Sequence, residues 1–234
     1  AVSTGDMADE FAGRDAMGLQ KDQKPQSEAE ARASYFRLFS KLIGLQAPLL
    51  CWSIYAVSVY LLPGGDVVAA KLAFIHRYSL GSIFAAWFAV YLVRIYASIN
   101  ANGARAPVRL DRPDQHVYKI MARDGPLVDA PYVMMASTGA AGRFNRAQRA
   151  AFNMDESLPT FLTGLLLQSC VFGAVGLFPA LLYAYGAAKF CDAYKESSGA
   201  RSSGFMPRVI AESLSAGMVG VCAIKGMMGP LVPF

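Results

Sequence analysis

Charged residues are missing from three long stretches of this 234-residue chain. Residues 42–65, 78–93 and 157–188 contain no Asp, Glu, Lys or Arg. Overall, 54% of residues are hydrophobic, 17% are charged, and the mean hydropathy is +0.32, which is high for a soluble domain. A soluble helical protein with a large core is the alternative, but the uninterrupted length of these runs disfavours it.

Several catalytic and metal-binding patterns are also missing. The chain has no C-x-x-C pair, G-x-S-x-G elbow, phosphate loop or dinucleotide fingerprint. His76 and His116 are far apart and lack a partner at ligand spacing, so we expect no metal site. Four isolated cysteines lie in or near apolar runs, and we predict that they are small buried hydrophobic residues: Cys51, Cys170, Cys191 and Cys222.

The apolar runs predict an all-α integral membrane protein. A helix needs about 20 mainly apolar residues to cross a bilayer. The longest run is interrupted by Gly173, Gly176 and Pro179, which favours a tight hairpin between two helices. We therefore predict four spans and one additional N-terminal span. Their approximate positions are 43–63 for the additional span and 79–99, 153–175, 178–195 and 208–228 for the other four.

The distribution of basic residues predicts the orientation of these spans. The connection from residue 100 to Arg149 carries eight Lys and Arg residues, the connection from Lys195 to Arg208 carries three, and the hairpin at 173–180 carries none. Five alternating helices place both basic connections and the N-terminus on one side, as the positive-inside tendency requires. The net charge of +5 is explained in this way, and no basic and aromatic stripe indicates nucleic acid.

The positions of the apolar runs divide the chain into three predicted parts. Residues 1–42 form a polar tail that ends in an amphipathic helix, which we expect to lie on the membrane surface or against a partner. Residues 43–65 form the additional transmembrane helix. Residues 70–234 form a four-helix membrane domain with a long loop at 100–148, and a loop of that length is usually functional or held by a partner.

A polar stripe stands at the start of the longest apolar run, in the sequence RAAFNMDESLPTFL (149–162). Arg149, Asn153 and Glu156 are spaced i, i+4, i+7 and so share one helix face. A guanidinium, an amide and a carboxylate on one face suit a zwitterionic ligand. The alternative is that these groups only tie the helix to its neighbours, and the spacing alone favours that alternative.

This stretch resembles the signature of the MAPEG family, the membrane-associated proteins of eicosanoid and glutathione metabolism. The shared pattern is Arg-Ala, Asn four residues after the Arg, Glu three residues later, then Pro and Phe-Leu. The segments LLYAYGAAKFCDAY and KESSGARSSGFMPR are similar to the family's third helix and the loop that follows it. The resemblance covers roughly residues 79 to 228.

The resemblance implies a four-helix membrane bundle that assembles as a homotrimer and uses glutathione on lipophilic electrophiles or peroxides. It implies that Arg149, Asn153 and Glu156 hold the peptide part of glutathione and that Tyr194 contacts it. Arg201 or Arg208 would stabilise the thiolate. The expected enzyme is thus a glutathione transferase or peroxidase in an organellar membrane, with endoplasmic reticulum, chloroplast and mitochondrion left open.

Departures from the family pattern support an alternative. Ser157 and Phe190 stand where members often have tyrosine, and Ala187 stands where an arginine is common. Each such loss removes a hydrogen bond or a charge from the implied pocket, at a cost of about 1–3 kcal/mol. Together with the additional helix and the polar tail, they suggest a non-catalytic subunit of a larger photosynthetic or respiratory membrane complex.

Overall fold

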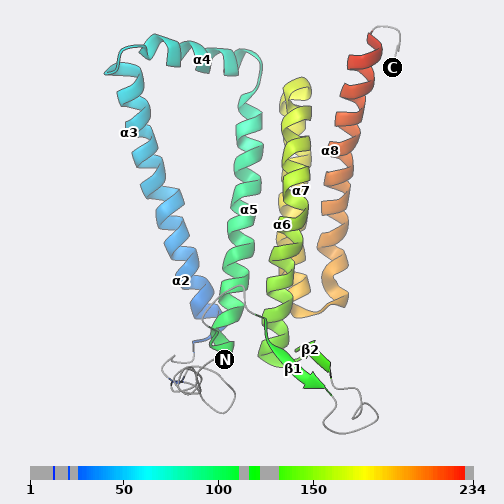
Figure 1. Ribbon diagram of the computed structural model, residues 1–234. Helices are drawn as coiled ribbons and strands as arrows, with labels where there is room; N and C mark the ends of the chain where they lie inside the picture. Colours follow the sequence, from blue (N-terminus) through cyan, green and yellow to red (C-terminus); the bar gives the residue numbers. More distant parts are fainter. Residues whose placement is uncertain (1–12, 14–20, 22–25, 111–115, 122–131, 230–234) are drawn as a thin grey trace, which may run out of the picture.

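The computed structural model describes residues 13, 21, 26–110, 116–121 and 132–229. Most of the predicted polar tail, residues 1–25, therefore lies outside the described residues. Long helices form most of the described chain, and two short strands form a hairpin (Figure 1). The helices are α2 (Glu28–Lys41), α3 (Ala47–Tyr60), α4 (Gly65–Arg77), α5 (Gly81–Arg105), α6 (Gly139–Phe172), α7 (Leu177–Glu196) and α8 (Ser202–Met228).

Within the described residues, four helical stretches are long and apolar enough to cross a membrane, consistent with a multi-pass membrane protein. They are Glu28–Tyr60, Gly81–Val108, Gly139–Glu196 and Gly199–Met228. The third contains both α6 and α7, which reverse direction at a short 3-10 turn, Gly173–Gly176. Each predicted span thus overlaps one of these four apolar helical stretches, and the predicted helical membrane bundle is consistent with the fold.

The helices run nearly parallel or antiparallel to one another, apart from α4 (Figure 1). The start of α2, the two-stranded β-hairpin and the connection from α7 to α8 lie at one end of the bundle. We call this the basic end, after Arg105, Arg143, Arg146, Lys195 and Arg201. The predicted placement of the basic connections on one side therefore agrees with the fold.

The amphipathic helix and the additional span form one continuous helical rod. Ser27 caps α2 through a capping box with Glu30, and a π-helical turn, Leu42–Gln46, carries the helix on into α3. The rod therefore runs through the boundary that we predicted at residues 42 and 43. It packs against α5 through α2, whereas none of the α3 residues is buried.

The helix α4 was not predicted. It crosses the end opposite the basic end, roughly perpendicular to the other helices (Figure 1). Gly64, with φ of +89°, makes the turn out of α3 that only glycine adopts readily. The 13 residues of α4 include both apolar and charged side chains, which suits a helix lying in the membrane interface.

The long connection before α6 is shorter than predicted. Helix α5 extends to Arg105, and α6 begins at Gly139, well before the predicted start near 153. Between them, the strands β1 (Tyr118–Met121) and β2 (Tyr132–Met135) pair in antiparallel register. Buried Asn145 anchors this hairpin, because its amide exchanges hydrogen bonds with the backbone of Val117 at 2.8 and 2.9 Å.

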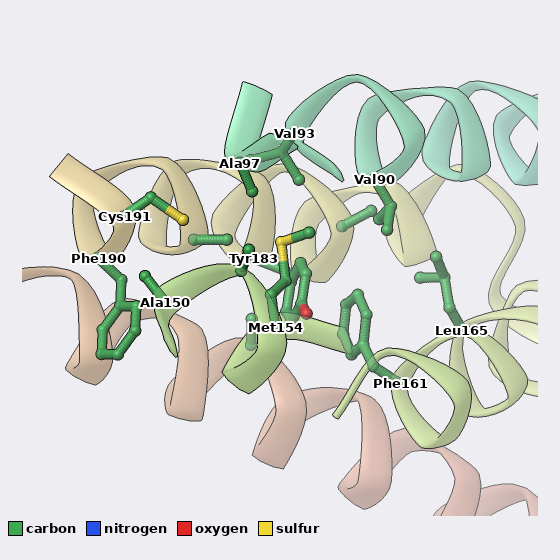
Figure 2. Close-up of a cluster of buried hydrophobic side chains, with 14 of the residues drawn as sticks. Val90, Val93, Ala97, Ala150, Met154, Phe161, Leu165, Tyr183, Phe190 and Cys191 are labelled. Atoms are coloured by element: carbon green, nitrogen blue, oxygen red, sulfur yellow. The ribbon is translucent and has the colours of Figure 1, made fainter. Parts of the chain in front are cut away.

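The apolar core lies between α5, α6 and α7, with α8 packed mainly on α7 (Figure 2). Phe161 stacks on Tyr183 with ring centroids 4.1 Å apart. The Tyr183 hydroxyl lies 3.2 Å from Ser157 Oγ, so this buried phenol is not left without a partner. The core residues labelled in Figure 2 are Val90, Val93, Ala97, Ala150, Met154, Phe161, Leu165, Tyr183, Phe190 and Cys191.

The prediction that all four cysteines are buried is wrong. Cys191 is buried, Cys222 is half-buried, and Cys51 and Cys170 are exposed on the outer faces of α3 and α6. In a membrane helix an exposed face meets lipid, so a small apolar side chain is stable there without protein contacts. An apolar run alone therefore does not separate core from lipid-facing positions.

Candidate functional site

The three residues of the predicted ligand stripe on α6 make two separate contacts: Arg149 pairs with Glu156, and Asn153 contacts α8. Arg149 Nη1 donates to Glu156 Oε1 at 2.8 Å, and Nη2 lies 3.3 Å from Oε2, so the two charges pair with each other. Both side chains are exposed, at 44% and 56%. The predicted shared face is correct, and the two ions neutralise each other along it.

Asn153 makes its contact with another helix. Its Oδ1 accepts a hydrogen bond of 2.6 Å from Arg208 Nη2 on α8. Arg208 is only 4% exposed, its guanidinium lies 5.1 Å from the centre of the Phe190 ring, and its Nε pairs with Glu212 at 3.5 Å. These contacts make Arg208 a clamp that joins α6, α7 and α8.

Arg201 differs from Arg208 in its surroundings. It belongs to the short 3-10 turn Gly199–Arg201 between α7 and α8, and its guanidinium lies 6.0 Å from the centre of the Tyr194 ring. Arg201 is exposed, so its charge can meet a ligand. Of the two candidate arginines, Arg201 is the one that remains accessible.

A cavity of about 460 Å³ at the basic end brings two of the predicted residues together. We call it the Arg201 cavity. It is lined by Asn153, Phe190, Ser198, Gly199, Arg201, Ser202 and Phe205. The α7–α8 connection supplies the guanidinium and hydroxyl groups, and α6 supplies the Asn153 amide. A cation, hydroxyls, an amide and two aromatic rings around one cavity suit a polar ligand with an anionic group.

The departures from the family pattern have structural roles here. Ser157 partners Tyr183, as described above, and Ala187 is buried in the α5–α6–α7 core. Phe190 stacks against the Arg208 guanidinium instead of offering a hydroxyl. The positions that lack the family's polar groups are therefore occupied by side chains that support packing and the clamp.

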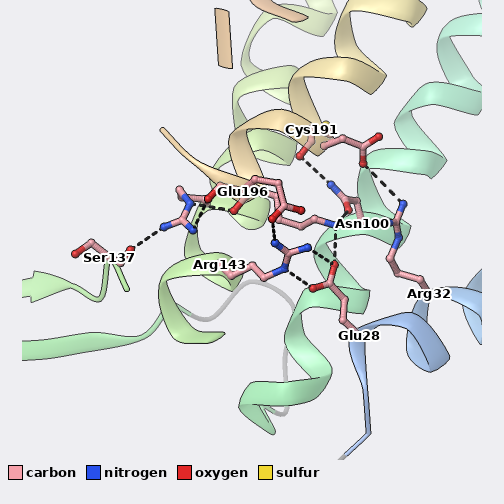
Figure 3. A network of polar contacts seen from close by, with 10 residues as sticks. Glu28, Arg32, Asn100, Ser137, Arg143, Cys191 and Glu196 are labelled. Atoms are coloured by element: carbon pink, nitrogen blue, oxygen red, sulfur yellow. Dashed lines mark hydrogen bonds and ion pairs between the residues drawn. The ribbon is translucent and has the colours of Figure 1, made fainter. Parts of the chain in front are cut away.

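A second polar cluster at the basic end was missed by sequence reasoning (Figure 3). Lys195 is 2% exposed, and its Nζ donates to Glu28 Oε1 at 2.6 Å and to Asn100 Oδ1 at 2.7 Å. Arg143 also binds Glu28, through Nε at 2.5 Å, and contacts Glu196. This cluster fastens the first turn of α2 to α5, α6 and α7.

The signal for this cluster was present but ambiguous. Lys195 and Arg143 fit the positive-inside pattern, which explains basic residues at this end without any specific partner. Glu28 is an ordinary acidic residue of a helix first turn. Glu28 can pair with Lys195 and Arg143 only because α2 packs against α5. This packing cannot be predicted from the local sequence.

Among the described residues, no group of three or more His, Cys, Asp or Glu is placed to hold a metal ion. Neither a protein-family model nor a curated protein matches the sequence.

Proposed function

We propose that the protein is a MAPEG-like membrane enzyme that binds glutathione in the Arg201 cavity and uses it on lipophilic electrophiles. The observation that carries the proposal is the meeting of Asn153 and Arg201 at one cavity. The two residues come from the two separate segments that resemble the family. Tyr194, from the same resemblance, lies against the Arg201 guanidinium.

The chemistry of this cavity would centre on the thiol. A thiol with a pKa of about 8.5 is only a few per cent ionised at neutral pH. A guanidinium beside the sulfur favours the thiolate, and each pKa unit gained contributes about 1.4 kcal/mol. The thiolate would attack the electrophile and form a C–S bond while the leaving group departs. The thiol proton would pass to water at the exposed end of the cavity.

The clamp residues have a supporting role in this proposal. Because Asn153 Oδ1 already accepts a hydrogen bond from Arg208, the Asn153 amide nitrogen is the group that can donate to a peptide carbonyl of glutathione. Arg149 and Glu156 would contact glutathione only if their mutual ion pair opened. The peptide part of the ligand would therefore rely on Asn153, Ser198 and Ser202 more than on that ion pair.

The alternative, a non-catalytic subunit of a membrane complex, has one structural observation in its favour. None of the residues of α3 is buried, and its large side chains, such as Leu50, Trp52 and Tyr60, are exposed. An arm of this kind could contact other subunits. It could equally be surrounded by lipid, which is why the Arg201 cavity carries the first proposal.

A conjugation assay tests the enzyme proposal. Protein in lipid nanodiscs is mixed with glutathione and 1-chloro-2,4-dinitrobenzene, and formation of the thioether is followed by absorbance. We expect a glutathione-dependent rate above the uncatalysed one, reduced at least tenfold in Arg201→Ala and retained in Arg149→Ala. A rate that does not exceed the background, with folded protein, would favour the subunit alternative.

A further inference from the structure

A second, larger cavity lies between α6 and α8, within the apolar part of the bundle. We call it the α6–α8 cavity. Its volume is about 790 Å³, and it is lined by Ser157, Pro159, Thr160, Phe161, Thr163, Gly164, Glu212, Ser215, Ala216 and Val219. None of these residues lines the Arg201 cavity. Asn153, which accepts a hydrogen bond from Arg208, lines the Arg201 cavity, whereas Glu212, which forms an ion pair with Arg208, lines the α6–α8 cavity.

The α6–α8 cavity lies midway along α8 and is open at its side. Ser215 follows the start of α8 by 13 residues, which corresponds to about 20 Å along the helix, or half its length. The rim residues Pro159, Thr160, Thr163 and Ala216 are exposed, whereas Ser215 and Phe161 are buried. A molecule dissolved in the bilayer could therefore enter between α6 and α8.

Two buried polar atoms at this cavity have no hydrogen-bond partner in the described part of the chain. They are Ser215 Oγ, on a residue that is 2% exposed, and Glu212 Oε1, whose 3.5 Å contact with Arg208 Nε is an ion pair without hydrogen-bond geometry. Glu212 and Ser215 are three residues apart, so they share one face of α8. An unsatisfied buried polar atom costs about 1–3 kcal/mol, which a ligand with matching groups would recover.

The charge at this cavity is already balanced. Arg208 pairs with Glu212, and its guanidinium is itself buried, so the two charges cancel. A ligand carboxylate would add an uncompensated charge in an apolar environment, which is costly. The cavity therefore selects a neutral ligand.

The hydrogen-bonding capacity of Glu212 and Ser215 limits which polar group the ligand can carry. The Glu212 carboxylate only accepts hydrogen bonds, whereas the Ser215 hydroxyl can donate and accept. A ligand hydroxyl can donate to Glu212 Oε1 and accept from Ser215 Oγ. A ketone accepts from Ser215 but leaves Glu212 Oε1 with no hydrogen-bond donor beyond the 3.5 Å ion-pair contact with Arg208 Nε.

We propose that the α6–α8 cavity binds a neutral lipophilic molecule that carries a hydroxyl group, with Glu212 and Ser215 holding that hydroxyl. The apolar body of the ligand lies against Phe161 and Val219 and extends toward the bilayer. This site is separate from the Arg201 cavity and does not depend on glutathione binding there.

The test uses three photoactivatable probes with one carbon skeleton and three head groups. Hexadecan-1-ol, hexadecan-2-one and hexadecanoic acid, each with a diazirine at the same mid-chain position, are irradiated with the full-length protein in nanodiscs. Labelled peptides are located by mass spectrometry. We expect the alcohol to label residues 159–164 and 215–219 at least five times more than the ketone or the acid, and unlabelled hexadecanol to compete.

Two variants separate binding from non-specific lipid contact. Ser215→Ala removes one hydroxyl and should reduce labelling by the alcohol at least threefold, without lowering the temperature of thermal unfolding. Gly164→Leu should abolish labelling by filling the cavity, because a Cβ at this position already lies 3.1 Å from Ser215 Oγ. Ile224→Ala, at an exposed position on α8, is the control and should label as wild type does.

The proposal is overturned if the three probes label these segments equally, or if Ser215→Ala labels as strongly as wild type. If Gly164→Leu does not fold, the head-group comparison and Ser215→Ala decide the outcome. Glutathione conjugation is measured in parallel on Ser215→Ala and should be unchanged, because Ser215 does not line the Arg201 cavity; its loss would contradict the separation of the two sites.

Discussion

Replacing Gly204 with alanine is expected to lower the free energy of unfolding by about 3 kcal/mol or more. The Cβ added at Gly204 would lie 2.1 Å from the backbone nitrogen of Phe190 and 2.6 Å from the carbonyl oxygen of Gly186. Neither atom belongs to a flexible side chain, so α7 and α8 would have to separate. Overpacking of this kind typically costs about 1–3 kcal/mol, and more where backbone must move.

The same helix provides a matched control. A Cβ at Gly217 meets nothing within 4 Å, and alanine is favoured over glycine in a helix by about 1 kcal/mol. Gly217→Ala should therefore be as stable as wild type or slightly more so. Both variants are compared by reversible unfolding in mixed detergent micelles. Equal stability of Gly204→Ala and Gly217→Ala would contradict the close approach of α7 and α8.

Replacing Lys195 with alanine should lower the free energy of unfolding by about 3–5 kcal/mol. The change removes both hydrogen bonds of the buried Lys195 ammonium, to Glu28 and Asn100. It leaves the Glu28 carboxylate, only 16% exposed, with Arg143 as its remaining ion-pair partner. Removing one member of a buried ion pair is costly because the other charge stays in an apolar environment.

The control for Lys195→Ala is an exposed ion pair. Arg149→Ala breaks the pair with Glu156, and exposed pairs contribute about 0–1 kcal/mol, so its stability should stay close to that of wild type. Glu28→Gln combined with Lys195→Ala should cost less than the sum of the single changes, because the two residues act together. Purely additive effects, or a Lys195→Ala variant as stable as Arg149→Ala, would contradict the fastening of α2 to the bundle.

The positions of the membrane helices could be predicted because the bilayer imposes a strong length requirement. The charge-free runs at 42–65, 78–93 and 157–188 correspond to α3, α5, and the end of α6 with most of α7. The ends of the helices were predicted less well. Helix α6 begins 14 residues before its predicted start because its first turns contain polar residues, such as Asn145 and Gln148, that are buried against protein.

The candidate site could be predicted only as a set of residues on a shared face. The i, i+4, i+7 spacing placed Arg149, Asn153 and Glu156 on one side of α6, but side-chain partners depend on tertiary structure. The pairing of Asn153 with Arg208 joins residues 55 positions apart in the sequence. The choice between Arg201 and Arg208 likewise depends on burial, which a loosely matched motif does not encode.

The position of α2 also could not be predicted from local sequence. Its amphipathic pattern suits a membrane surface or a partner equally well. Helix α2 packs against α5, where Ala31 is buried, but its apolar residues Phe36 and Leu38 remain exposed. The same chain therefore covers only part of the α2 surface.

The central proposal is that the Arg201 cavity is a glutathione site, and binding calorimetry in detergent solution tests it most directly. We expect wild-type protein and Arg149→Ala to bind glutathione at millimolar concentration or below. Arg201→Ala should weaken binding at least tenfold while its thermal unfolding stays unchanged. Folded wild-type protein that does not bind glutathione, or an Arg201→Ala variant that binds it as tightly as wild type does, would contradict the proposal.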